Sequence, residues 1–199
     1  MSIEPVTLEG RHVRLEPLSL DHHERLSEVG LDDTIWRWSP SRMRTSDDMR
    51  AYIEEALLAQ ASGTALPFAT VEQASGRVIG STRYANIEAT HRRLEIGWTW
   101  IAPRWQRTAV NTEAKYLMLR HAFETLGCQR VEFKTDSLNE RSRNAILRLG
   151  AKEEGTFRNH MIAYTGRVRH SVYFSIIETE WPEVKARLEE KLARSYSSP

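Results

Sequence analysis

The fold is decided by a stretch that reads LEIGWTWI at residues 94–101, APRWQRTAVNTEAKYLMLRHAFETLG at 102–127 and CQRVEFKT at 128–135. The first and last segments predict strands, because they are rich in β-branched and aromatic residues and are bounded by charged or turn residues. The middle segment predicts a helix that Thr112 caps and Gly127 ends. One helical face is expected to carry Leu117, Met118, His121, Ala122 and Thr125. Such a strand-helix-strand crossover almost always joins parallel strands.

The loop that leads from the first strand into this helix is a candidate site for a phosphate or pyrophosphate. The first N–H groups of a helix have no partner within the helix, and the helix dipole is positive at that end. Arg104 and Arg107 add positive charge in the same loop. Every crossover of this kind has such a loop, so this feature alone leaves ligand binding open.

The rest of the chain predicts a single domain over residues 1–199 that combines helices with a sheet. Further strands are expected at Arg11–Leu18, Pro67–Glu72, Arg77–Ala85, Lys152–Ile162 and Val168–Ile177. Further helices are expected from Asp21 to about Val29, from Thr45 to Ser62, and over Glu183–Ala193. Residues Ser195–Pro199 are expected to fray. Three antiparallel strands, the last at residues 94–101, would precede the parallel crossover.

Charge and composition limit the classes of partner. The chain has 28 basic and 27 acidic residues, a formal net charge of +1, which argues against a nucleic-acid or membrane partner. The single Cys128 excludes an internal disulfide and is expected to be a buried, inert thiol. We find no leader sequence, no apolar run of about 18 residues and no metal-ligand spacing. We therefore expect a cytoplasmic protein without a metal.

Two motifs in the decisive stretch and just after it resemble a known family. Gln106–Thr112, followed by Glu113 and Ala114, resembles the acyl-CoA loop of the GNAT N-acetyltransferase superfamily, whose usual form is Gln/Arg-x-x-Gly-x-Gly/Ala. Asn139–Ala151 is similar to the next motif of that superfamily. Together with Ile96–Trp98 and Glu154–Arg158, these motifs most closely resemble the RimJ/RimL-like branch, which acetylates protein N-termini. The resemblance covers about His12 to Glu180.

The resemblance implies an α/β (α+β) fold. Its sheet would be mixed and mostly antiparallel, with about seven strands flanked by helices and a splayed parallel pair that holds acyl-CoA. The chain departs from the family at two places. The loop glycines fall at Arg107 and Ala109 and the last small residue at Asn111, so the backbone must approach a pyrophosphate without the freedom of glycine. The tyrosine that protonates the leaving thiolate in many members is replaced by Ile146.

The chemistry of acetyl transfer suggests roles for several residues. Glu95, at the start of the first parallel strand, is the candidate general base, although it could instead be solvated or paired with Arg92 or Arg93. By resemblance, Asn139 would hold the pantetheine arm, although it could be a simple helix cap, and Ser142 would donate the proton. Backbone N–H groups in the strand, at Trp98, Thr99, Trp100 and Ile101, could bond the pantetheine amide and the thioester oxygen. The resemblance further implies cofactor contacts in the two motifs, at Gln106, Arg107, Thr108, Ala109, Val110, Asn111, Thr112, Asn139 and Arg143.

The expected reaction is acetyl transfer from acetyl-CoA to a primary amine by direct attack on the thioester. A peptide α-amine costs about 1.4 kcal/mol to deprotonate at pH 7 and a lysine about 4.6 kcal/mol, which favours an N-terminal acceptor. The resemblance points to ribosomal-protein N-termini. Trp36 and Trp38, which could instead fill the core, and Tyr164 would bind the acceptor. The alternative function is a noncatalytic acyl-CoA-binding or interaction module. The chain could also form a homodimer.

Overall fold

The decisive stretch forms the expected crossover in the computed structural model, which describes residues 3–196. Strand β5 (Arg93–Ile101) leads into helix α4 (Ala109–Arg120) and strand β6 (Arg130–Asp136), and β5 and β6 pair in parallel. The predicted cap at Thr112 is wrong. Thr108 caps α4 instead, because its extended backbone lets its hydroxyl accept a hydrogen bond from the N–H of Val110.

The end of this helix also differs from the expectation. Residues His121–Thr125 form a π-helical turn, so the regular helical spacing ends at Arg120. Leu117, Met118 and Ala122 are buried as expected, whereas Thr125 is exposed. The wider turn therefore rotates the last predicted face residue out of the core.

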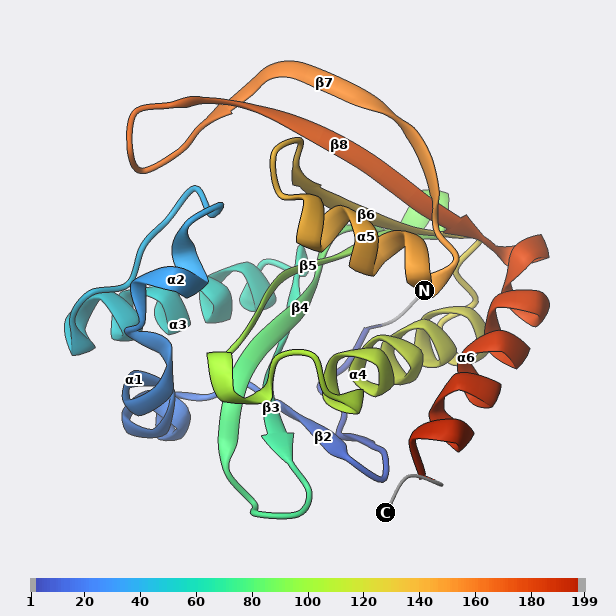
Figure 1. The fold of residues 1–199 in the computed structure, drawn as a ribbon, viewed down its shortest axis with the longest axis horizontal. Helices are drawn as coiled ribbons and strands as arrows, with labels where there is room; N and C mark the ends of the chain where they lie inside the picture. Colours follow the sequence, from blue (N-terminus) through green and yellow to red (C-terminus); the bar gives the residue numbers. More distant parts are fainter. Residues whose placement is uncertain (1–2, 197–199) are drawn as a thin grey trace.

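The described residues form one eight-stranded sheet in the order β1-β2-β3-β4-β5-β6-β8-β7 (Figure 1). The other strands are β1 (Leu8–Glu9), β2 (Val13–Pro17), β3 (Leu66–Glu72), β4 (Val78–Glu88), β7 (Lys152–Ile162) and β8 (Val168–Ile177). Only the β5–β6 pair is parallel among them. This confirms the predicted fold class, with eight strands in place of about seven because the short β1 adds to β2.

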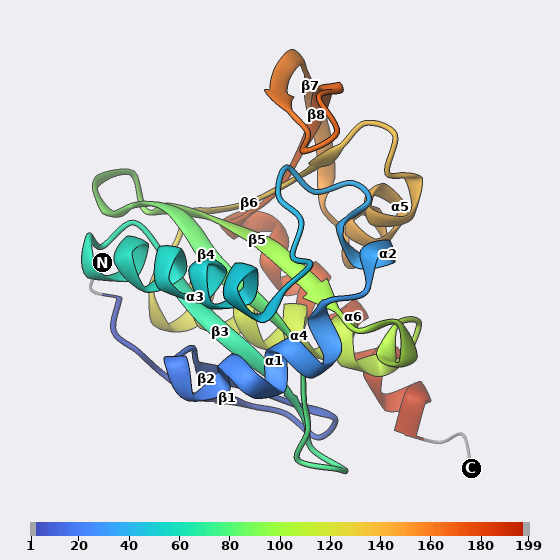
Figure 2. The same cartoon turned by 90° about the vertical axis from the view of Figure 1, so that its left-hand side faces the viewer.

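Helices cover both faces of the sheet (Figures 1 and 2). The remaining helices are α1 (His23–Gly30), α2 (Asp33–Trp36), α3 (Ser46–Ala61), α5 (Glu140–Leu149) and α6 (Trp181–Tyr196). In Figure 2, α1 and α3 lie in front of β3 and β4, while α4 and α6 lie behind. No helix within residues 3–196 is long and apolar enough to cross a membrane.

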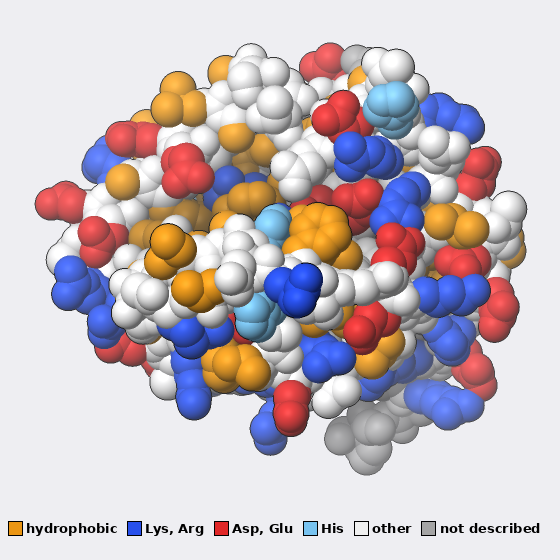
Figure 3. All heavy atoms as spheres, turned by 90° about the horizontal axis from the view of Figure 1, so that it is seen from above, with side chains coloured by type: hydrophobic (Ala, Val, Ile, Leu, Met, Phe, Trp, Pro, Cys, Tyr) orange, Lys and Arg blue, Asp and Glu red, His pale blue; other side chains and the backbone are white. Residues whose placement is uncertain are grey.

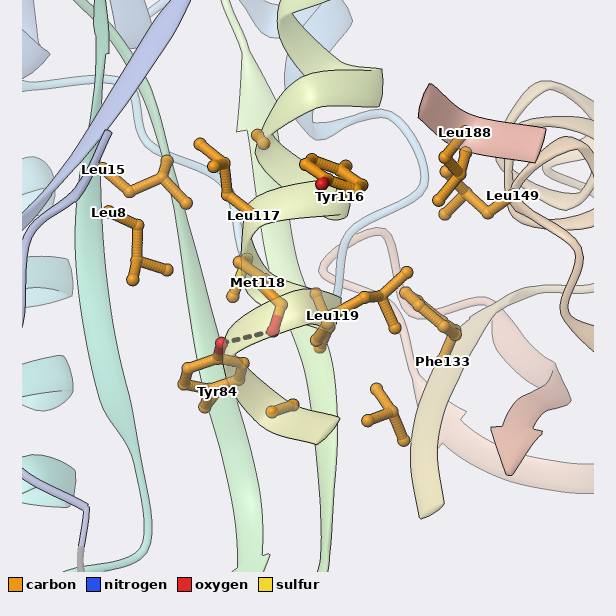
Figure 4. Packing of buried hydrophobic residues seen from close by; sticks show 14 of the residues in the cluster. Leu8, Leu15, Tyr84, Tyr116, Leu117, Met118, Leu119, Phe133, Leu149 and Leu188 are labelled. Atoms are coloured by element: carbon orange, nitrogen blue, oxygen red, sulfur yellow. Dashed lines mark hydrogen bonds between the residues drawn. The ribbon is translucent and has the colours of Figure 1, made fainter. Parts of the chain in front are cut away.

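Each face of the sheet has its own hydrophobic core. The larger core joins the sheet to α4, α5 and α6, and includes Leu94, Ile96 and Cys128. Figure 4 shows part of it, where the Tyr84 hydroxyl donates a hydrogen bond to the Met118 carbonyl at 2.7 Å. The smaller core lies under α1 and α3 and contains Trp36 and Trp100. On β5, Leu94 and Ile96 therefore point into the larger core, whereas Trp100 points into the smaller one.

Two expectations at the ends of the chain need correction or fall outside the description. The first helical segment is capped by Ser19, not Asp21. The 3₁₀ turn Leu20–His22 follows Ser19 and leads into α1, and Nδ1 of His22 accepts a hydrogen bond from the Ser19 N–H. The predicted capping box at Thr45 and Asp48 is confirmed. Fraying was expected over Ser195–Pro199. The first two of these residues continue α6, which ends at Tyr196, and residues 197–199 lie outside the described residues.

Glu113, part of the loop motif, acts as a structural anchor. Its carboxylate accepts hydrogen bonds from the N–H groups of Arg11, His12 and Val13 at 3.0, 2.6 and 2.8 Å. We expect Glu113→Ala to lower the free energy of unfolding by about 3 kcal/mol, because buried backbone donors lose a charged acceptor. Urea unfolding measures this. Glu140→Ala, at an exposed helix start, is the control, and a loss for Glu113→Ala under about 1 kcal/mol would contradict the anchor.

Candidate functional site

The two parallel strands part at the level of Glu95. Pairing between β5 and β6 covers only Arg93–Glu95 and Arg130–Glu132, although β5 continues to Ile101 and β6 to Asp136. Alternate N–H groups of β5 beyond Glu95 therefore face the gap and not a neighbouring strand. An open pair of strand edges of this kind offers hydrogen bonds to an extended ligand.

A β-bulge shapes the same part of β5. The register with β4 shifts between the pairs Ser81–Trp100 and Arg83–Gly97, and Trp98 adopts a left-handed conformation with φ of 49°. Trp98 is consequently 42% exposed, while Trp100 is buried in the smaller core. The four residues Trp98–Ile101 thus lie on the part of β5 beyond its pairing with β6, and the bulge gives their side chains unequal surroundings.

The loop before α4 contains one left-handed residue although it has no glycine. Arg107 has a φ of 66°, in the left-handed region that glycine adopts most readily. Gln106 fixes the loop, because its Nε2 donates to the Ile101 carbonyl at 2.7 Å and its Oε1 accepts from Arg141 at 2.6 Å. Ala109, Val110, Asn111 and Thr112 form the first turn of α4, so Asn111 needs no left-handed backbone.

The second motif begins helix α5 with an asparagine cap. Oδ1 of Asn139 accepts a hydrogen bond from the N–H of Ser142 at 3.1 Å. The capping role is therefore real, but it uses only the carboxamide oxygen, and Nδ2 has no hydrogen-bond partner within residues 3–196. The Ser142 hydroxyl is half-buried and likewise has none there. Arg143 binds Glu153 at 3.2 Å, and Ile146 is buried in the larger core.

Glu95 is neither solvated nor paired with Arg92 or Arg93, and both of these readings of the sequence are wrong. Its side chain is 2% exposed. Oε2 accepts a hydrogen bond from Asn86 at 2.9 Å and lies 3.3 Å from Nζ of Lys134. Burial raises the pKa of this carboxyl, and the Lys134 charge and the Asn86 hydrogen bond partly oppose that rise.

The second carboxylate oxygen of Glu95 is left for a ligand. Oε1 receives no hydrogen bond from any described residue. A Cβ atom on Gly97 would lie only 2.8 Å from it, so the absence of a side chain at Gly97 makes room for Oε1 in this position. A buried carboxylate with one oxygen held and the other free is able to accept a proton from a bound group.

Glu95 points to the face of the sheet that carries α1 and α3, because its neighbours Leu94 and Ile96 point into the larger core. Lys134 shares this face and lies 5.6 Å from the ring centroid of Trp98 and 5.7 Å from that of Tyr173. Sequence patterns missed Asn86, Lys134 and Tyr173. The alternation along β6 and β8 marks the faces of Lys134 and Tyr173, but only the sheet order places them, and Asn86 of β4, beside Glu95.

The two tryptophans proposed for acceptor binding lie in different surroundings. Trp36 is buried against Tyr52 and Trp100 in the smaller core, and its Nε1 donates to the Gly30 carbonyl at 2.7 Å. Trp38 is half-buried, and its carbonyl accepts a hydrogen bond from Arg169 of β8 at 3.3 Å.

The segment after α2 touches the tip of the β7–β8 hairpin at two further places. The Arg167 guanidinium lies 5.6 Å from the ring of Trp38, and that of Arg42 lies 5.5 Å from the ring of Tyr164. Trp38 and Tyr164 therefore do belong to one side of the molecule.

The surface over the β7–β8 side is hollowed and mixed in character. A shallow pocket there is lined by Phe157, Arg158, Asn159, His160 and His170. Figure 3 looks onto this side and shows histidine and apolar side chains among acidic and basic ones. No cluster of His, Cys, Asp or Glu within the part of the chain that the structure describes could hold a metal ion.

Comparisons with known proteins agree with this geometry. A family model described as an acetyltransferase (GNAT) domain matches residues 12–152. "Putative ribosomal N-acetyltransferase YdaF" of Bacillus subtilis (strain 168) is 33% identical over 107 residues, which are 53% of this chain and 57% of that protein. A second curated relative matches over 47% of its own length, so the chain spans about half the length of both.

Two solved structures extend the similarity over nearly the whole chain. A GCN5-related N-acetyltransferase from Brucella melitensis is 31% identical, with a TM-score of 0.88, over 94% of this chain and 86% of that chain. Mycobacterium smegmatis RimJ in complex with CoA-disulfide is 22% identical, with a TM-score of 0.82, over 94% of this chain and 95% of that chain. At that identity, the second likeness shows the fold alone.

Proposed function

The chain belongs to the GNAT acetyltransferase family, and on this premise we propose that it is an acetyl-CoA-dependent N-acetyltransferase of primary amines. The acceptor we propose is the α-amine of a protein or peptide N-terminus. The name of the relative YdaF directs attention to ribosomal proteins as a source of such N-termini. The low pKa of an α-amine makes it the easier group for a carboxylate base to deprotonate.

The observation that carries this proposal is the state of Glu95. Oε2 is fixed by Asn86 and Lys134, while Oε1 lies beside Gly97 and receives no hydrogen bond from any described residue. Burial raises the carboxyl pKa toward neutral pH, where a general base works best. Glu95 would accept the amine proton as the nitrogen forms its bond to the carbonyl carbon and the carbon–sulfur bond breaks.

The residues along the gap fit an acyl-CoA. The first N–H groups of α4 and the side chain of Arg107 would bind the pyrophosphate, and the free edge of β5 at Trp98–Ile101 would bind the pantetheine amides. Nδ2 of Asn139, which the helix cap leaves unused, would add a donor. Acetyl-CoA would supply the acetyl group as an activated thioester.

Two other side chains bear on the proton that the leaving thiolate needs and on the route of acetyl transfer. Ser142, with a hydroxyl not engaged by any described residue, would donate a proton to the leaving thiolate in place of the tyrosine that Ile146 replaces. Cys128 is buried, and burial raises its pKa to about 11, so it is unsuited to carry an acyl group. These observations support direct transfer from the thioester to the amine.

Calorimetric titration with acetyl-CoA and with free CoA, followed by mass spectrometry of peptides incubated with protein and acetyl-CoA, tests the proposal. We expect micromolar binding and a gain of one acetyl group at the peptide N-terminus. Binding without transfer to any amine would favour the noncatalytic acyl-CoA-binding module. Absence of binding would contradict both functions.

Arg107→Ala tests the loop separately. Alanine suffers a similar strain at a positive φ, so we expect little change in stability but a roughly fivefold weaker affinity for acetyl-CoA, because one exposed charge near the pyrophosphate is lost. Titration at low and high salt measures the loss, which should shrink as salt screens the charge. Arg148→Ala, an exposed change near the end of α5, is the control. Equal affinities for the Arg107→Ala variant and the unmodified protein would remove Arg107 from the site.

A further inference from the structure

Arg83 is a buried cation that has no ion-pair partner among residues 3–196. It lies on β4, opposite Gly97 of β5, and is 2% exposed. Its Nε and Nη2 atoms are buried without a hydrogen-bond partner. No carboxylate of the described residues lies within 4 Å of its guanidinium. Arginine stays charged in proteins, and a buried charge without a partner is costly, so this arrangement calls for a compensating group.

Two aromatic rings provide only part of that compensation. The Arg83 guanidinium lies 5.0 Å from the ring centroid of Tyr52 on α3 and 5.1 Å from that of Trp98. Cation–π contacts attract the charge but satisfy none of its N–H donors in the guanidinium plane. The left-handed backbone of Trp98 brings its partly exposed ring over the arginine. The result is a planar donor next to two rings, with donor atoms left for an oxyanion.

The position of Arg83 relates it to the proposed base. Ala85 pairs with Glu95 and Arg83 with Gly97, so Arg83 and Glu95 are diagonal neighbours on the same face of the sheet. Diagonal neighbours in antiparallel strands have Cα atoms about 7–8 Å apart. A small acceptor whose amine contacts Oε1 of Glu95 would therefore have its adjacent groups within reach of Arg83.

We propose that Arg83 binds a carboxylate of the acceptor, and so selects amines that carry a carboxylate close to the reacting nitrogen. This inference rests on the proposed acetyltransferase function and specifies its substrate class. The carboxylate has two chemical sources. It is either the side chain of an N-terminal Asp or Glu in a peptide, or the α-carboxylate of a free amino acid. A guanidinium recognises both by the same forked pair of hydrogen bonds.

The experiment compares acceptors that differ only in this group. One arm uses peptides that begin with Asp or Asn, and with Glu or Gln; the other uses free alanine and alaninamide. We expect kcat/KM to be about tenfold higher or more for the carboxylate member in one arm, and that arm identifies the source. Calorimetric titration of the same pairs should show the same preference in binding without turnover.

Variants of Arg83 test whether this residue causes the preference for a carboxylate. Arg83→Met should reduce the preference to within about twofold, while acetyl-CoA affinity and turnover of the amide member persist. Arg50→Met, which removes an exposed guanidinium from α3, should keep the full preference. If Arg83→Met does not fold, Arg83→Lys retains the charge without the fork and should give an intermediate preference.

The outcomes separate the inference from the function. Acetylation by the unmodified protein with no preference in either arm, in turnover or in binding, would overturn the inference and leave the function intact. A preference that survives in Arg83→Met would also overturn it. Failure to bind acetyl-CoA or to acetylate any amine would contradict the function, while the binding comparison would still decide whether Arg83 recognises a carboxylate.

Discussion

Glu95→Gln is expected to lower kcat/KM for the acceptor by about 10²–10⁴-fold and to leave acetyl-CoA affinity within about twofold. Glutamine has nearly the same shape and keeps an oxygen for the hydrogen bond from Asn86, but it cannot accept a proton from the amine. Steady-state acetylation of an N-terminal peptide measures the first quantity, and calorimetric titration measures the second.

Glu132→Gln is the matched control for this variant. Glu132 pairs directly with Glu95 across the two parallel strands, but its carboxylate is bound by Arg93 and Arg130. Removing the same charge one strand away should change kcat/KM only by a few fold. If Glu95→Gln retained the rate to within about threefold, another group would have to be the base.

The pH dependence of the reaction provides a second test of Glu95. On the acid side, kcat/KM should rise as the carboxyl loses its proton, and burial places this limb at higher pH than for an ordinary glutamate. Because the Lys134 charge lowers the pKa of Glu95, Lys134→Met should move the limb to still higher pH. The same acceptor is used for both proteins, so protonation of the amine itself affects the two pH profiles equally. An unchanged limb in Lys134→Met would show that another group titrates.

The crossover and the position of the proposed base could be predicted from sequence because both depend on local patterns. The apolar run that ends at Ile101, the helical spacing after it and the turn at Gly127 each act over a few residues. The cap was assigned to the wrong threonine because Thr108 and Thr112 both suit that role. Only the extended backbone at Thr108 selects between them.

The surroundings of Glu95 were not predictable in the same way. Its contact with Lys134 depends on how far β5 and β6 stay paired, and the crossover of about thirty residues between them encodes no register. The Trp98 ring lies over Arg83 because β5 has a bulge and a left-handed backbone at this residue, and a left-handed tryptophan has no clear sequence signal. Pairing between strands that are distant in sequence therefore decides which side chains surround Glu95, whereas local sequence patterns decide the strands and the helix of the crossover.

A buried lysine under the same bulge should make stability depend on pH. Lys115 of α4 is 5% exposed, and its Nζ donates to the hydroxyls of Thr82 and Thr99 at 3.0 and 2.5 Å. The structure shows no carboxylate within 4 Å of Nζ among the described residues, and burial lowers the pKa of this lysine from 10.5 to about 7. Folding therefore favours the neutral amine.

The sign of the effect follows from proton binding in the two states. Between pH 7 and 10.5 the unfolded chain holds this proton and the folded chain does not, so the free energy of unfolding rises with pH. The slope from this group is at most about 1.4 kcal/mol per pH unit. Below pH 7 both states are protonated, so the destabilisation by the buried charge is complete there and constant.

Lys115→Met should consequently be more stable than the unmodified protein near pH 7, by a few kcal/mol, and the difference should shrink as pH rises toward 10.5. The two threonine hydroxyls remain satisfied in the variant, because they also bond to each other at 2.7 Å. Urea unfolding at several pH values measures the difference, in which contributions from other groups cancel. Lys152→Met, at an exposed lysine, should show no such pH dependence. A stability difference for Lys115→Met that does not vary with pH would mean that the lysine remains charged in the folded protein.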